Sequence, residues 1–186
     1  AVGTPGSCRV VAEINPYWGD PWGDSHATIV ARRLALTAPG TGLIGYDTVF
    51  QGVCDDRLLA EALQWVIDHR NNYNIVAINM SLGTDADGEQ PLGPYSTEDC
   101  PPDNDNDFQR LRKAGVMPIA GVGNDGSWQT TKHAFYGVSH PACSPFVVSV
   151  GSSDYAGDLI WGGSTRGPNL DLLAPGPEEL LLQRQL

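Results

Sequence analysis

Basic residues are scarce in this chain of 186 residues, in which 11 lysines and arginines stand against 22 acidic residues and the formal net charge is −11. Only two of the basic residues are lysines, Lys113 and Lys132. Nucleic acids and anionic membrane surfaces are bound mainly through basic patches. The composition therefore predicts no nucleic acid and no membrane among the partners of this protein.

Long apolar runs are lacking as well. The uninterrupted hydrophobic stretches are only a few residues long, whereas a transmembrane helix needs about 20 apolar residues. We therefore expect no membrane-spanning helix. Hydrophobic residues nevertheless make up 41% of the chain, which is enough for a core, and the length fits a single domain.

Closely spaced cysteine pairs are absent, because Cys8, Cys54, Cys100 and Cys143 are far apart and form no C-x-x-C motif. This spacing argues against a zinc ribbon or a thiol redox site. An even count permits two disulfides in a secreted protein, in three possible connectivities, while four reduced, buried cysteines would suit a cytosolic protein. We favour a secreted or otherwise extracytoplasmic chain.

Apolar stretches rich in β-branched residues alternate with segments of helical periodicity. Strands are expected at 9–15, 43–50, 75–80, 116–121, 146–150 and 170–173, and helices at 25–38, 57–70 and 108–114. This alternation predicts an α/β fold with a mostly parallel sheet and helices on both faces. Ligands bind at the carboxyl ends of the strands in such folds, where Asn15, the segment after Met80, and Asn124 are expected.

A histidine lies at the start of the first expected helix. Ser25 suits the N-cap, and Ala27, Val30 and Leu34 repeat at helical spacing. His26 would then be held rigidly near a cleft, where an imidazole can transfer protons near neutral pH. On this segment alone, a structural histidine is an equally good interpretation.

Several motifs occur in an order that resembles the subtilisin-like serine peptidases. The segment 25–31 reads S-H-A-T-I-V-A and resembles the family's S-H-G-T-H-V-A, Ile78–Gly83 matches I-N-M-S-L-G, and Ala120–Gly126 is similar to A-A-G-N-x-G. Further similar segments are found at 140–142, 147–151 and 170–176. The resemblance implies an incomplete subtilisin-like fold over residues 1–176, followed by an unrelated C-terminal tail at 177–186.

The resemblance also implies roles for individual residues. His26 would be the general base, and Asn124 would donate to a developing oxyanion, a contribution of roughly 3–4 kcal/mol in such enzymes. Ser81, Leu82 and Gly83 would line a groove that binds an extended peptide by strand addition. Without the family order, Asn124 would be interpreted as a turn residue and Ser81–Gly83 as a strand end.

Two catalytic positions depart from the family pattern. The family's first strand ends in aspartate, but Asn15 stands at the aligned position. Asp24 is the substitute nearest to His26 in sequence, with Asp20 and Glu13 as alternatives. The G-T-S-M-A-S-P motif that carries the nucleophilic serine does not occur in the sequence, and neither does G-x-S-x-G.

Three functions therefore remain open for this chain by itself, and a fourth requires a second chain. The chain is a subtilisin-like hydrolase that is not a competent peptidase, or a non-catalytic binding scaffold, or an active hydrolase of esters or phosphoesters. In the last case His26 would work with water, with Ser81 or Ser139, or with a metal held by a set drawn from Asp20, Asp24, His26, His133 and His140. A separate chain that supplies the serine helix would instead restore a complete peptidase.

No cofactor is required by these schemes, but a structural calcium ion is possible. Asp85 and Asp87 resemble part of a calcium loop, and Asp103, Asp105 and Asp107 follow in the same acidic region. Many subtilisin-like proteins bind calcium, which favours the ion. A solvated acidic loop is the alternative.

The serine helix fills the middle of the family's fold, so its absence predicts exposed apolar surface. We expect a second copy of the chain to cover that surface in a homo-oligomer, with a contribution from Leu180–Leu182. The implied fold also places Cys54 and Cys100 in loops at the carboxyl ends of strands. It therefore favours a Cys54–Cys100 disulfide over Cys8–Cys54.

Overall fold

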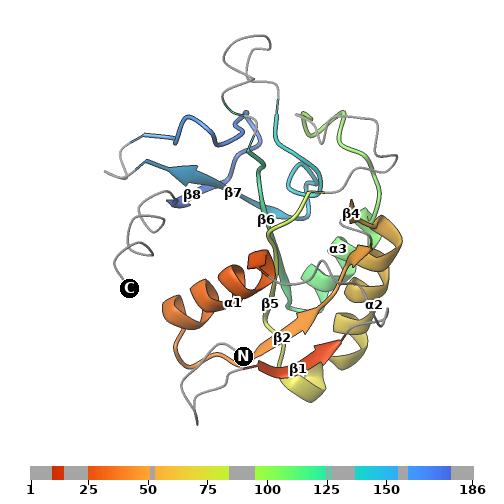
Figure 1. Cartoon of the computed structure of the whole chain (residues 1–186). Coiled ribbons are helices and arrows are strands. Elements are labelled where there is room, and N and C mark those ends of the chain that lie inside the picture. The colour runs from red at the N-terminus through yellow and green to blue at the C-terminus, as the bar shows by residue number, and fades with distance from the viewer. Residues whose placement is uncertain are drawn as a thin grey trace.

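The computed structural model describes residues 10–14, 25–50, 53–83, 95–124, 126, 137–154 and 159–176 (Figure 1). The sequence predictions for several residues lie outside these ranges: Cys8, Asn15, Asp20, Asp24, Asp85, Asp87, His133 and the tail 177–186. None of the helices in the described ranges has the length and hydrophobicity that crossing a bilayer requires.

Strands and helices alternate largely as the sequence predicts. The strands are β1 (Val10–Ile14), β2 (Leu43–Tyr46), β3 (Val49–Phe50), β4 (Val53–Cys54), β5 (Ala77–Met80), β6 (Met117–Gly121), β7 (Val148–Ser153) and β8 (Leu172–Pro175). The helices are α1 (Ser25–Thr37), α2 (Asp56–Tyr73) and α3 (Asp105–Lys113). One strand prediction is wrong: the segment 43–50 divides, because β3 turns to pair antiparallel with β4 instead of continuing β2.

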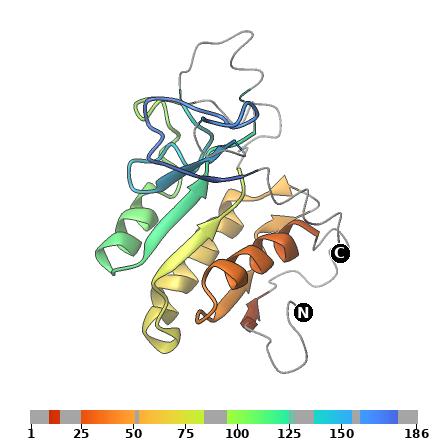
Figure 2. The same ribbon diagram turned by 90° about the vertical axis from the view of Figure 1, so that its left-hand side faces the viewer.

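The predicted α/β fold with mostly parallel strands is confirmed. The strands β5, β6, β7 and β8 form a parallel sheet in that order, and β1 pairs with β2 in a second parallel sheet. Figures 1 and 2 show α1 on one side of β5, with α2 and α3 on the other side. In the described residues the parallel strands therefore form two sheets where the sequence predicts one, and β3 and β4 form a separate antiparallel pair.

Helix α2 has well-defined ends. The side chain of Asp55 accepts hydrogen bonds from the backbone N–H groups of Arg57 (2.8 Å) and Leu58 (3.3 Å), which satisfies two of the free donors in the first turn. The helix ends at Asn74, which has a left-handed backbone conformation with φ 52°. These caps fix the helix whose apolar face covers the sheet.

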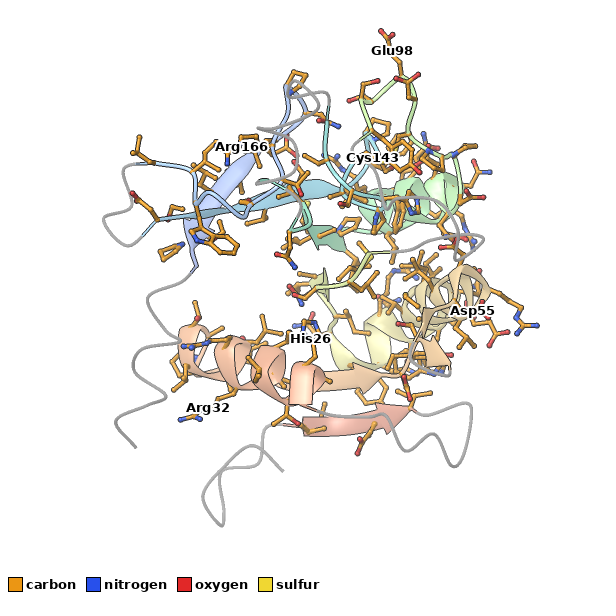
Figure 3. All side chains as sticks on the ribbon, turned by 45° about the horizontal axis from the view of Figure 1, so that its top comes forward. His26, Arg32, Asp55, Glu98, Cys143 and Arg166 are labelled. Carbon is orange, nitrogen blue, oxygen red and sulfur yellow. A yellow bond between two sulfur atoms is a disulfide. The ribbon has the colours of Figure 1, made fainter. Side chains whose placement is uncertain are left out.

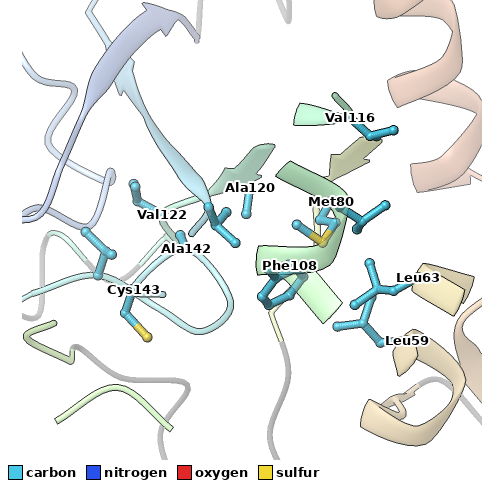
Figure 4. Packing of buried hydrophobic residues seen from close by; sticks show 12 residues of the cluster. Leu59, Leu63, Met80, Phe108, Val116, Ala120, Val122, Ala142 and Cys143 are labelled. Carbon is cyan, nitrogen blue, oxygen red and sulfur yellow. The ribbon is translucent and has the colours of Figure 1, made fainter. Parts of the chain in front are cut away.

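The hydrophobic core lies between the four-stranded sheet and the pair α2 and α3 (Figure 4). Phe108 and Leu111 of α3 are completely buried, and they belong to one cluster with Leu59 and Leu63 of α2. The sheet contributes Met80 and Ala120 to this cluster, together with neighbouring residues Val116, Val122, Val138, Ala142, Cys143 and Val147. One face of the sheet is therefore closed.

The other face of the sheet, on the side of α1, is open among the residues that the structure describes. Residues on β6 and β7 alternate between buried and partly exposed, and no side chain from His26 to Thr37 on α1 is buried. Leu36, Met117 and Leu172 are 63%, 40% and 56% exposed. Parallel sheets normally have both faces covered, so the described residues expose apolar side chains on this side of the sheet.

Candidate functional site

The side chain of His26 contacts the segment that follows β5. Its Nε2 lies 2.7 Å from the carbonyl oxygen of Ser81, although the two residues are 55 positions apart in the sequence. Figure 3 shows His26 at the start of α1, between that helix and the end of β5, and its side chain is exposed. The structure thus brings together two of the residues that the sequence selected as functional.

Ser81, Leu82 and Gly83 extend directly from β5, which pairs only with β6 among the described strands of its sheet. The side-chain amide of Asn79 donates to Ser81 Oγ (2.9 Å). Leu82 packs against the core cluster. These contacts hold the segment that leaves the carboxyl end of β5, and strand addition takes place along an outer strand of this kind.

Asn124 follows β6 and is exposed. The turn before it depends on Gly123, which has φ +97° and lies so close to Ser139 Oγ and Thr165 Oγ1 that a Cβ there would collide with them. The carbonyl of Gly123 accepts from the N–H of Thr165 (3.1 Å). Met80 pairs with Ala120 in the parallel ladder between β5 and β6. Ser81 and Asn124 therefore both follow the carboxyl ends of neighbouring strands, at the same end of the sheet.

Asn79 is a positioning residue that the sequence reasoning missed. It contacts Ser81 because residues two apart on a strand point to the same face, a signal already present in the I-N-M-S sequence. The sequence offers Ser139 only as a nucleophile for His26. In the structure it is buried, and no partner of its Oγ is found in the part of the chain that the structure describes.

His140 is placed in the interior of the protein. It is 2% exposed, and its Nε2 lies 3.3 Å from the carbonyl oxygen of Asp103. Asp105 accepts from the hydroxyl of Ser144, and Asp107 pairs with Arg110 at 2.8 Å. Within the described ranges, no group of three His, Cys, Asp or Glu residues is arranged to hold a metal ion.

The predicted disulfide between Cys54 and Cys100 is wrong, because Cys100 pairs with Cys143 across 43 positions with a Cα–Cα distance of 5.6 Å. The loop before α3 packs against the segment before β7, and that contact brings the two cysteines together. Cys54 remains a free thiol. Burial raises its pKa to about 11, against the opposing effect of a hydrogen bond with Thr48, so it stays protonated and is a poor nucleophile at neutral pH.

Comparison with known proteins decides the family. The model of the subtilase family matches residues 13–185. The chain belongs to the subtilase family. It is 28% identical over 177 residues to subtilisin of Bacillus pumilus, a match that covers 92% of this chain and 57% of the relative. Subtilisin E of Bacillus subtilis (strain 168) is 27% identical over 183 residues, which cover 92% of this chain and 41% of that protein.

Solved structures agree on the fold of this subtilase. A lanthipeptide protease superimposes with a TM-score of 0.62 at 22% identity, over 87% of this chain and 45% of the other. The epidermin leader peptide processing serine protease of Staphylococcus aureus superimposes with a TM-score of 0.52 at 20% identity, over 79% and 37% of the two chains. The chain spans about half the length of the curated relatives that it matches.

Proposed function

We propose that this subtilase chain binds extended peptides along Ser81–Gly83 and is not by itself a competent peptidase. The observation that carries the proposal is the contact of His26 with the Ser81 carbonyl at the edge of the sheet. Main-chain groups after an edge strand supply affinity for a peptide in strand addition. The family's G-T-S motif does not occur in these 186 residues, so His26 has no serine partner of that kind within the sequence.

A second candidate function is the hydrolysis of activated esters or phosphoesters. It is supported by the exposure of His26 and Asn124 at the same end of the sheet. In this scheme His26 activates water or the hydroxyl of Ser81, and the amide of Asn124 donates to the oxyanion. A non-catalytic binding scaffold is the remaining alternative: it binds peptides along Ser81–Gly83, as in the main proposal, and hydrolyses no substrate.

One panel of substrates separates these functions. We expect a chromogenic peptide to stay at background and aryl esters to be hydrolysed slowly, because an ester with a good leaving group needs no general acid. Turnover should fall to background in His26→Ala and about 10²-fold, or to background, in Asn124→Ala. His69→Ala is the matched control, because His69 lies on α2 stacked on Trp65 and should keep the rate.

Each outcome of this panel decides between the proposals. Peptide hydrolysis by the unmodified chain would show that the main proposal is wrong. Ester turnover that survives His26→Ala would overturn the ester candidate, and loss of turnover with a chelator would assign it to a metal. If every substrate stays at background, the ester candidate is overturned and the main proposal holds in its non-catalytic form, the binding scaffold.

We also propose a structural calcium ion held by Asp85 and Asp87, supported by the acidic sequence around them. Calcium at 100 times its dissociation constant would stabilise the fold by about 2.7 kcal/mol and raise Tm by about 5–10 °C. The measurement is thermal unfolding with millimolar calcium and with chelator. The calcium-dependent rise in Tm should vanish in Asp85→Asn/Asp87→Asn. If calcium does not raise the Tm of the unmodified protein, the calcium proposal is wrong.

The open face of the sheet supports a homodimer in which a second copy covers the apolar residues around α1 and β8. We expect sedimentation at micromolar concentration to show a dimer that Leu172→Glu converts to monomer, because a charge in an apolar interface is costly to desolvate. Val11→Glu is the matched control, since Val11 is equally exposed (58%) but lies on β1. A stable, folded monomer would overturn the dimer.

A further inference from the structure

Resting on the proposed function, we infer that His26 is held as its Nε2–H tautomer by the Ser81 carbonyl, so that Nδ1 is the proton-accepting atom. A backbone carbonyl oxygen can only accept a hydrogen bond, and Nε2 lies 2.7 Å from it. Nε2 must therefore carry the proton in the neutral ring, which leaves the lone pair on Nδ1. In this state His26 donates a hydrogen bond to the carbonyl oxygen of Ser81.

This tautomer separates peptide binding from peptide cleavage. The two ring nitrogens lie on opposite edges of the imidazole, so the lone pair of Nδ1 is directed away from Ser81. A general base must reach the proton that it removes, at a heavy-atom distance of about 2.6–3.2 Å. A nucleophile that approaches a peptide at Ser81–Gly83 meets the N–H edge of His26, which cannot accept its proton.

The acceptor that holds this tautomer is rigidly placed. Ser81 follows directly from β5, and Leu82 after it is packed against the core cluster. Helix α1 fixes the backbone of His26. Ser81 is therefore a positioning residue that acts through its main chain, and its side chain is dispensable for the tautomer.

A second histidine of the chain provides an internal comparison. The Nδ1 atom of His69 lies 2.8 Å from the carbonyl oxygen of Trp65, one turn earlier on α2. By the same chemistry, Nδ1 carries the proton in His69 and Nε2 carries the lone pair. The structure thus assigns opposite tautomers to His26 and His69.

The first test is the ¹⁵N spectrum of the histidine side chains in labelled protein, at a pH where both rings are neutral. His26→Gln and His69→Gln assign the two sets of resonances. We expect a protonated Nε2 and an unprotonated Nδ1 for His26, and the reverse for His69. A proton on Nδ1 of His26 would overturn the inference.

The second test identifies the unprotonated ring nitrogen of His26 by its reaction with iodoacetate. The unprotonated nitrogen of a neutral imidazole attacks the methylene carbon of iodoacetate, forming an N–C bond and releasing iodide. We expect His26 to be carboxymethylated at Nδ1, both in the unmodified protein and in Ser81→Ala, which keeps the carbonyl. Modification at Nε2, or a change of site in Ser81→Ala, would contradict the role of the carbonyl.

Failure of this inference and failure of the proposed function give different results. Binding of a fluorescent peptide, followed by anisotropy, reports on the groove whatever the tautomer is. A protein that binds the peptide but carries the proton on Nδ1 refutes the inference alone. A protein that binds no peptide refutes the proposed function, whichever tautomer its spectrum shows.

Discussion

Asn15→Asp should raise peptidase kcat by up to about 10⁴ once a serine-bearing segment of a subtilase is added to the chain, since replacing the aspartate of such a triad by asparagine costs about that factor. A carboxylate accepts a hydrogen bond from Nδ1–H, which keeps the proton on Nδ1 and leaves the lone pair on Nε2, facing the nucleophile. An asparagine amide can instead donate to Nδ1, and it then favours the Nε2–H tautomer. Turnover of a chromogenic peptide by the reconstituted pair measures the effect.

The controls for this experiment use the same two components. An added segment whose serine is replaced by alanine should abolish activity in both versions of the chain. If Asn15→Asp changes nothing while the pair is active, another group such as Asp24 orients His26. If no combination is active, supply of the serine by a separate segment is excluded as a route to peptidase activity.

Removing the disulfide in Cys100→Ala/Cys143→Ala should lower the free energy of unfolding by about 4 kcal/mol. The bridge closes a loop of 43 positions, and the chain-entropy relation gives about 4 kcal/mol for a loop of that length. Cys143 is also 1% exposed and belongs to the core cluster, so its truncation adds a packing loss. Chemical denaturation, followed by circular dichroism, measures the change.

Cys54→Ala is the matched control, because Cys54 is a partly buried cysteine without a bridge and should cost much less. An equal midpoint for the double variant and the unmodified protein would show that the bridge does not stabilise the fold.

The Cys100–Cys143 disulfide also bears on where the protein is found. We propose that the protein is secreted or extracytoplasmic, because disulfides persist in oxidising compartments. Peptide mapping without reductant, on protein isolated from the cells that produce it naturally, should recover the Cys100–Cys143 pair. Free thiols at Cys100 and Cys143 in that sample would contradict this location.

The boundaries of the helices and strands show how much of the secondary structure local sequence pattern predicts. The apolar repeat predicts a helix over 57–70, and α2 extends over Asp56–Tyr73 because caps at both ends add to the periodic part. The fifth strand is predicted at 146–150, but β7 covers Val148–Ser153, since its ladder with β8 continues to Ser153. Pairing with a neighbouring strand sets such boundaries, and the sequence of one segment does not specify which strand it pairs with.

The sequence by itself determined the α/β class, the order of the elements, and the motifs that contain His26, Ser81 and Asn124, because these depend on short-range periodicity and residue type. Only the tertiary structure decided that Cys100 pairs with Cys143 and that His26 donates to the Ser81 carbonyl. Both contacts join segments more than 40 positions apart. Their partners are selected by how loops and strands pack in space, which no local pattern specifies.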